Sequence, residues 1–138
     1  MKPTLYVTNV ASRDLYGPGR SLHIMVWQAK WASFFGCVQG LRPHERDLIA
    51  YKNRAISLRS YKLLYKKWVA PVDLSPCALG ITSTTAPPTS LGPVQDGDTL
   101  LCSCSRSTAA RGECHRVWAA ELLKEAGWDV ILDGRELK

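Results

Sequence analysis

The clearest pattern in the chain is an apolar stripe with helical spacing near its C-terminus. The stripe consists of Trp118, Ala119, Leu122, Leu123 and Ala126. Because these positions fall on one face at 3.6 residues per turn, the pattern predicts an amphipathic helix. Gly127 follows the last apolar position and is typical of a helix C-terminus, since glycine adopts a left-handed conformation cheaply.

Short apolar runs lie on both sides of this helix, at residues 99–102 and 130–132. Strand, helix and strand in this order form a β-α-β unit, in which the two strands are parallel. The loop from Cys102 to His115 then lies at the carboxyl edge of the sheet, where open α/β sheets bind their ligands. The sequence predicts an α/β fold: a single compact domain with a Rossmann-like, mostly parallel sheet flanked by helices.

The rest of the chain supplies further elements to this domain. Residues 5–7 and 22–27 have the composition of strands. An aromatic segment at residues 31–38 fits a loop or a short helix. Two helices are predicted between residues 42 and 67, the second beginning at an N-cap, Ser57. Residues 71–98 are rich in Pro, Ser, Thr and Gly without periodicity, which predicts an irregular surface segment within the domain of residues 1–138.

Composition limits the class of protein. The chain has 138 residues, of which 46% are hydrophobic, enough for one globular domain with a real core. Its five cysteines are an odd number and too few for a disulfide scaffold, which favours a reducing compartment and predicts a cytoplasmic protein. We expect no secretory signal and no membrane association, because no apolar run approaches the roughly 18 residues of a membrane span.

The net charge of +6 is concentrated in the two helices of residues 42–67, which carry eight lysines and arginines against two acidic residues. A one-sided basic patch is typical of a surface that binds nucleic acid, although a solvated helix face has the same composition. The candidate nucleic-acid-binding residues are Arg54, Arg59, Lys62 and Lys66.

The candidate chemical site is the Cys/His/Arg loop between the strand and the C-terminal helix. In one interpretation it is an anion site with a reactive thiol, in which Cys102, Cys114 and His115 are catalytic. A helix N-terminus and nearby arginines lower a thiol pKa and attract phosphate. The candidate phosphate-binding residues are Arg106, Arg111, Arg116 and Arg20.

A second interpretation of the same loop is a metal site. Cys102 and Cys104 are two residues apart on a strand and share a face, and Cys114 with His115 could complete a Cys₃His tetrahedron for zinc. A third interpretation is purely structural, in which small buried cysteines seal the strand against the helix while His115 and Arg116 bond loop carbonyls. The residues alone leave all three open.

The order of these motifs resembles a known family. A Leu-Leu-Cys strand at residues 100–102 and a Cys-His-Arg helix start at residues 114–116 are preceded by Leu-Arg-Pro at residues 41–43 and by Tyr-Lys-Asn-Arg-Ala-Ile-Ser at residues 51–57. This pattern resembles the DUF488 family, and the Cys-x-Cys and Cys-His layout is also similar to DUF4326. Both resemblances imply a compact α/β domain with a Rossmann-like sheet, and neither implies a settled activity.

Two functions follow as hypotheses. As an enzyme of hydrolase or N-glycosidase type, the protein would process a nucleotide, a nucleic acid or another phosphate-containing substrate at the carboxyl edge of the sheet. As a non-catalytic module, it would bind nucleic acid or an acidic protein through the basic helices and carry a structural Cys/His zinc site.

Overall fold

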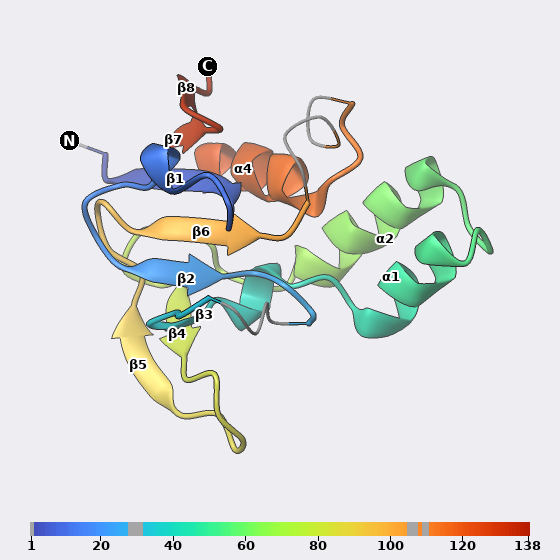
Figure 1. Ribbon diagram of the computed structural model, residues 1–138, viewed down its shortest axis with the longest axis horizontal. Coiled ribbons are helices and arrows are strands. Elements are labelled where there is room, and N and C mark those ends of the chain that lie inside the picture. The colour runs from blue at the N-terminus through green and yellow to red at the C-terminus, as the bar shows by residue number, and fades with distance from the viewer. Residues whose placement is uncertain (1, 28–31, 105–107, 109–110) are drawn as a thin grey trace.

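The computed structural model describes residues 2–27, 32–104, 108 and 111–138 (Figure 1). Its centre is an eight-stranded sheet with the strand order β5-β4-β3-β2-β6-β1-β7-β8. The strands are β1 (Thr4–Asn9), β2 (Ser21–His23), β3 (Gly36–Cys37), β4 (Gly80–Thr82), β5 (Ser90–Pro93), β6 (Thr99–Cys102), β7 (Asp129–Leu132) and β8 (Arg135–Glu136).

The middle of the sheet is parallel and its margins are antiparallel. β3, β2, β6, β1 and β7 run in one direction. β4 is antiparallel to β3, β5 is antiparallel to β4, and β8 is antiparallel to β7. β1 lies between β6 and β7, so the predicted β-α-β crossover passes over one strand. The predicted α/β fold with a mostly parallel sheet is confirmed.

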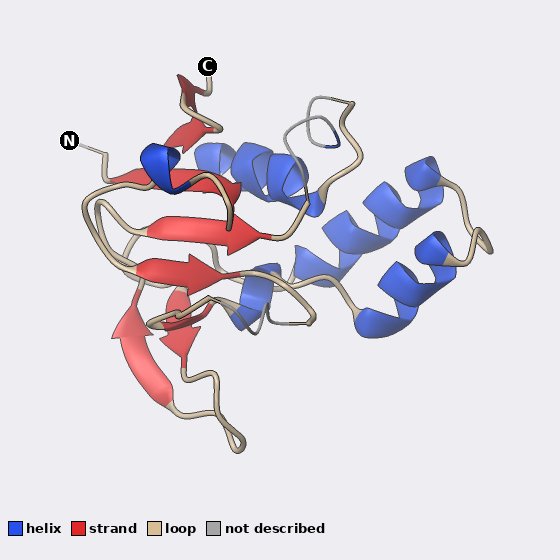
Figure 2. Cartoon of the chain, viewed as in Figure 1, coloured by secondary structure: helices blue, strands red, loops and turns tan. Residues whose placement is uncertain are grey.

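Helices cover the sheet and extend beyond one of its edges (Figure 2). α4 (His115–Glu125) packs on β7 and β1, α2 (Leu58–Val69) packs on α4, and α1 (Glu45–Lys52) packs on α2. Two short 3₁₀ helices, η1 (Arg13–Leu15) and η2 (Gln39–Leu41), lie in connections. In Figure 1, α1 and α2 project past the carboxyl ends of β2 and β6, which places them next to the predicted site.

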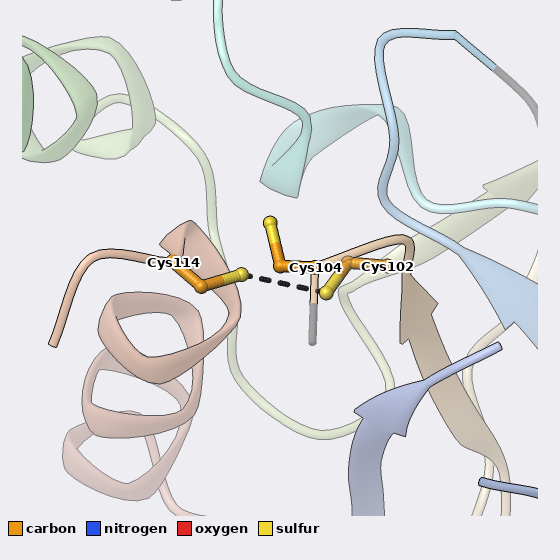
Figure 3. Close-up of side chains that lie close together, drawn as sticks. All are labelled: Cys102, Cys104 and Cys114. Atoms are coloured by element: carbon orange, nitrogen blue, oxygen red, sulfur yellow. Dashed lines mark hydrogen bonds between the residues drawn. The ribbon is translucent and has the colours of Figure 1, made fainter. Parts of the chain in front are cut away.

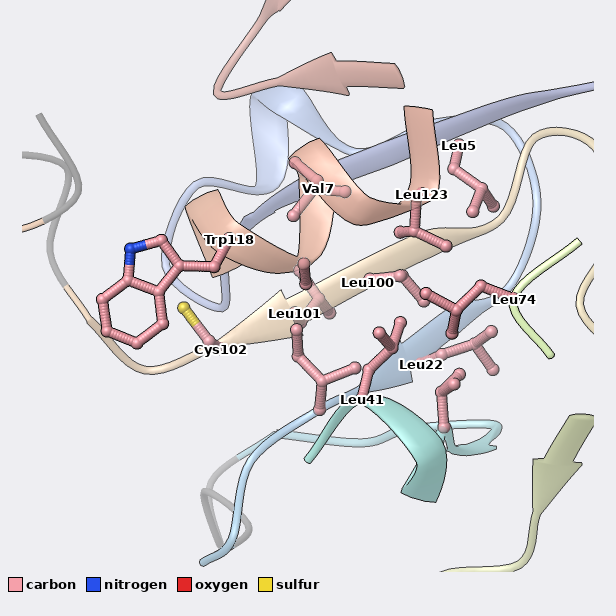
Figure 4. Packing of buried hydrophobic residues seen from close by; sticks show 14 of the residues in the cluster. Leu5, Val7, Leu22, Leu41, Leu74, Leu100, Leu101, Cys102, Trp118 and Leu123 are labelled. Atoms are coloured by element: carbon pink, nitrogen blue, oxygen red, sulfur yellow. The ribbon is translucent and has the colours of Figure 1, made fainter. Parts of the chain in front are cut away.

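Burial follows the apolar pattern most closely at β6 and α4. All four residues of β6 are buried, as expected for a central strand of a parallel sheet. Trp118 and Leu123 of α4 pack against this sheet core (Figure 4). Gly127 follows α4 with a φ of 112°, the left-handed conformation predicted for the residue after the helix. The clearest apolar patterns in the sequence, those of β6 and α4, thus correspond to well-buried elements of the fold.

Three local predictions need correction. Residues 71–98 are not wholly irregular, because β4 and β5 lie there and extend the sheet; marginal strands tolerate polar residues and a terminal proline. The strand predicted at residues 22–27 ends at His23, whose Nδ1 accepts the N–H of Met25 at 3.3 Å and turns the chain. The aromatic segment is mostly a loop, one of the two alternatives predicted, but it also contributes the two-residue strand β3; Trp31 lies outside the described residues.

Within the described ranges, no helix has the length and apolar character needed to cross a membrane.

Candidate functional site: a three-cysteine cluster

Three cysteines meet at the carboxyl end of β6 (Figure 3). Cys102 is the last residue of β6, Cys104 lies two residues further, and Cys114 is the N-cap of α4. The Cys114 Sγ accepts the backbone N–H of Arg116 at 3.5 Å, which fixes the thiol at the helix start. The central strand and the helix that follows it therefore bring together thiols from both sides of the connecting loop.

The sulfur positions are close to those of a tetrahedral metal site. The three Sγ atoms all lie within 4.8 Å of one another, and those of Cys102 and Cys114 are 3.4 Å apart. Zinc holds thiolates at about 2.3 Å, which separates two sulfurs in a tetrahedron by about 3.8 Å. The donor set and its spacing therefore fit one zinc ion with only small side-chain shifts.

Arg116 places a buried positive charge beside the cluster. Its side chain is fully buried, and its Nη1 donates to the Cys102 Sγ at 3.1 Å and to the Cys104 carbonyl at 2.7 Å. Its Nη2 donates to the Asp133 carboxylate at 3.1 Å, which also accepts the Thr8 hydroxyl at 2.9 Å. Because a buried guanidinium is costly unless it is paired, these contacts identify Arg116 as the counter-charge of the sulfurs.

The same contacts determine the acidity of the thiols. Hydrogen bonds from the Cys102 and Cys114 thiols lower the pKa of Cys104 against the effect of burial, and the charge of Arg116 acts in the same direction. Burial raises the pKa of Cys102. The cluster therefore favours a thiolate at the sulfur nearest to solvent, and the guanidinium balances its charge.

His115 does not join the three thiols. Its Nε2 lies 2.8 Å from the carbonyl oxygen of Ile24, and because a carbonyl can only accept, this nitrogen carries the proton. Burial lowers the pKa of His115, so the ring is neutral. The structure thus gathers three of the four predicted metal ligands, and the imidazole Nε2 of the fourth is committed to the segment after β2.

A cavity of about 180 Å³ opens beside Cys104 and Cys114. Its walls include Tyr51 of α1 and Tyr61 of α2, whose rings stack at 4.9 Å. The Tyr61 hydroxyl is buried and has no hydrogen-bond partner among the described residues. A smaller hollow of about 60 Å³ reaches Cys104 from the segment after β2. The cluster is therefore accessible at Cys104, whereas Cys102 is sealed in the core.

The predicted phosphate-binding arginines do not form one site. Arg20 precedes β2, at the opposite end of the parallel strands, and its guanidinium pairs with Asp98 through two contacts, at 2.7 and 3.1 Å. Arg111 pairs with Glu113 at 3.2 Å near the surface. Arg106 lies outside the described residues. Since Arg116 is engaged by the sulfurs, a phosphate at this loop would have to displace existing partners.

Three of the four candidate nucleic-acid-binding residues lie on α2, and Arg54 lies in the connection between α1 and α2. Arg54 and Arg59 are exposed, while Lys62 and Lys66 are half-buried on α2. An exposed aromatic ring accompanies them, because Trp27 lies 5.2 Å from the ammonium group of a lysine at the end of α1. The basic helices thus present cations with an aromatic neighbour, as single-strand binding surfaces do.

Sequence reasoning missed two residues of this site. Asp133 marks only a turn in the sequence, yet its carboxylate holds Arg116. Tyr61 belongs to the apolar stripe of α2, yet its hydroxyl reaches the cavity wall without a partner. Neither role leaves a local signal, because both depend on elements that are distant along the chain.

Comparison with protein-family models, with curated proteins and with solved structures gives no match for this chain. The resemblance to DUF488 or DUF4326 therefore stays a prediction.

Proposed function

We propose that this protein is a zinc protein in which Cys102, Cys104 and Cys114 bind one metal ion whose fourth position faces the cavity beside Cys104. The observation that carries the proposal is the meeting of three thiols within 4.8 Å beside a hollow of about 180 Å³. Three thiolates and one Zn²⁺ carry a net charge of −1, which the buried Arg116 balances.

An accessible fourth position favours a catalytic role over a structural one. Structural zinc sites are closed by four protein ligands, whereas catalytic sites keep one position for water or substrate. A bound zinc ion would supply Lewis acidity at this position. The chain's own contribution is a pocket with the stacked rings of Tyr51 and Tyr61, which would orient a small ligand. The reaction class that this arrangement favours is hydrolysis, including that of a phosphate-containing substrate.

Metal content tests the proposal directly. Protein purified without chelator is expected to contain about one zinc per chain, and Cys104→Ser is expected to lose most of it, because the half-buried Cys104 can be changed with little effect on packing. Cys77→Ser is the matched control, since this thiol is exposed and outside the cluster. Equal zinc content in the two variants would refute the site.

Cobalt substitution tests the open position. Cobalt in the cluster should show intense tetrahedral d–d bands with thiolate charge-transfer absorption, and added imidazole should change these bands by occupying the fourth position. Bands that imidazole leaves unchanged would indicate a closed, structural site. Hydrolysis of p-nitrophenyl phosphate, compared between the wild type and Cys104→Ser, then tests the reaction class.

We infer that the basic helices have a second function, binding of nucleic acid, favoured by the contact of Lys52 at the end of α1 with the exposed Trp27 ring. If α2 binds a single-stranded nucleic acid, log affinity should fall linearly with log salt, by about 0.7 per phosphate contacted. Arg59→Ala and Lys62→Ala should each reduce this slope by about that amount. Lys124→Ala, on α4, serves as the control. Slopes that are equal in all four proteins would argue against the basic helices as the binding surface.

A further inference from the structure

A second cavity, of about 280 Å³, lies at the carboxyl ends of β2 and β3 and shares no residue with the cysteine cluster. The residues on which its chemistry depends are His23, Cys37, Arg42, Ser83, Thr84 and Thr85. No acidic residue is among the described residues that line it. Its volume is close to the lower end of the range for small-ligand sites, about 300 Å³.

The centre of this cavity is the guanidinium of Arg42. Its Nη2 donates to the Val26 carbonyl at 2.8 Å, while its Nε is buried without a hydrogen-bond partner among the described residues. No carboxylate of the described chain lies within ion-pair distance of it. A partly buried cation without a counter-charge costs free energy, and an anion in the cavity would supply that charge.

α2 holds this arginine in place. The Trp68 indole N–H donates to the Arg42 carbonyl at 3.1 Å, and the Tyr65 hydroxyl donates to the carbonyl of the preceding Leu41 at 2.8 Å. These bonds fix the backbone on which the guanidinium is carried. The Arg42 side chain that lines the cavity is therefore carried by a preorganised segment, as a binding site requires.

The other polar groups of the cavity also act as donors. The Nδ1 of His23 accepts the N–H of Met25 at 3.3 Å, so the neutral ring carries its proton on Nε2. Burial and the charge of Arg42 lower the pKa of His23 to about 4, which keeps the ring neutral near pH 7. Burial raises the pKa of the Cys37 thiol, against the charge of Arg42 and a hydrogen bond with its side chain. The hydroxyls of Ser83 and Thr84 complete a lining rich in donors.

We propose that this cavity is an oxyanion site that binds a phosphate group, with Arg42 as the charged donor. A guanidinium suits phosphate because its planar fork offers several N–H groups to one anion. Inorganic phosphate and a phosphomonoester both carry such a phosphate group, and a guanidinium recognises it in either ligand. The cavity volume favours the ester, since it leaves space beyond a single phosphate ion.

Calorimetric titration of the full chain with inorganic phosphate and with ribose 5-phosphate, at constant ionic strength, tests the proposal. Saturable binding is expected, and Arg42→Lys should weaken it at least tenfold, because lysine keeps the charge but loses the fork. Arg135→Lys is the matched control at an exposed position of β8 and should bind as the wild type does. Tighter binding of the ester identifies a phosphomonoester as the ligand, and equal binding identifies inorganic phosphate.

A second measurement covers the case in which Arg42→Lys does not fold. In ¹⁵N-labelled wild-type protein, the Nε–H resonance of Arg42 should shift on addition of inorganic phosphate and should not shift with chloride at the same ionic strength. The proposal is overturned by a resonance that phosphate leaves in place, by no saturable binding at about 10 mM of either ligand, or by equal affinities of Arg42→Lys and Arg135→Lys.

Discussion

Two arginines at the same edge of the sheet have opposite environments. Arg116 is fully buried, and its two terminal nitrogens are engaged by sulfur, by a carbonyl and by Asp133. Arg42 lines a cavity, donates to one carbonyl and has no ion pair within the described chain. The charge of Arg116 is therefore already balanced within the fold, whereas the charge of Arg42 is still available to a ligand.

The largest expected effect concerns stability. Replacing Arg116 by methionine should lower the free energy of unfolding by about 3–5 kcal/mol, because Asp133 and the sulfur cluster lose their buried counter-charge. Arg42→Met should cost clearly less, since it removes no ion pair seen in the described chain. Urea unfolding of both variants measures the difference. Similar losses in the two would break the contrast between the arginines.

A second prediction uses the low pKa of His23, to which the charge of Arg42 contributes after burial. A pKa of about 4 in the folded state, against about 6.5 in the unfolded state, means that the unfolded chain binds more protons between these values. This contribution to stability is complete above pH 6.5 and is lost as the pH falls towards 4.

Between pH 6.5 and 4, the free energy of unfolding should fall by at most about 3 kcal/mol through His23, as measured by urea unfolding. The free energy of unfolding of His23→Gln should depend less steeply on pH than that of the wild type. The slope that remains includes the contribution of His115, whose pKa is also lowered by burial. Identical pH profiles of the two proteins would show that His23 is not held neutral beside Arg42.

The smallest effect is expected from two tyrosines of α2. Like the two arginines, they differ in whether their polar groups have partners. The Tyr65 hydroxyl donates to the Leu41 carbonyl at 2.8 Å, whereas the Tyr61 hydroxyl is buried without a partner in the described chain. Tyr65→Phe should therefore cost about 1 kcal/mol, and Tyr61→Phe should be neutral or slightly stabilising. Thermal unfolding of both variants provides the measurement. A loss on Tyr61→Phe as large as that on Tyr65→Phe would show that the Tyr61 hydroxyl is satisfied after all.

Much of the fold followed from local patterns. The stripe on α4, the glycine after it and the apolar run of β6 predicted the central strand-helix-strand unit and placed Cys102 and Cys114 at one edge. The margins were harder, because β4 and β5 have polar, proline-containing sequences and form through pairing with neighbours rather than through their own propensity.

The sequence by itself determined which residues are apolar, where helices begin and end, and that the thiols converge at the carboxyl edge of a parallel sheet. Only the tertiary structure decided which charges are already paired there. It assigned Asp133 and the sulfurs to Arg116, Asp98 to Arg20, and a cavity to Arg42. The reason is that burial periodicity is a property of neighbours along the chain, whereas pairing depends on side chains brought together from distant segments.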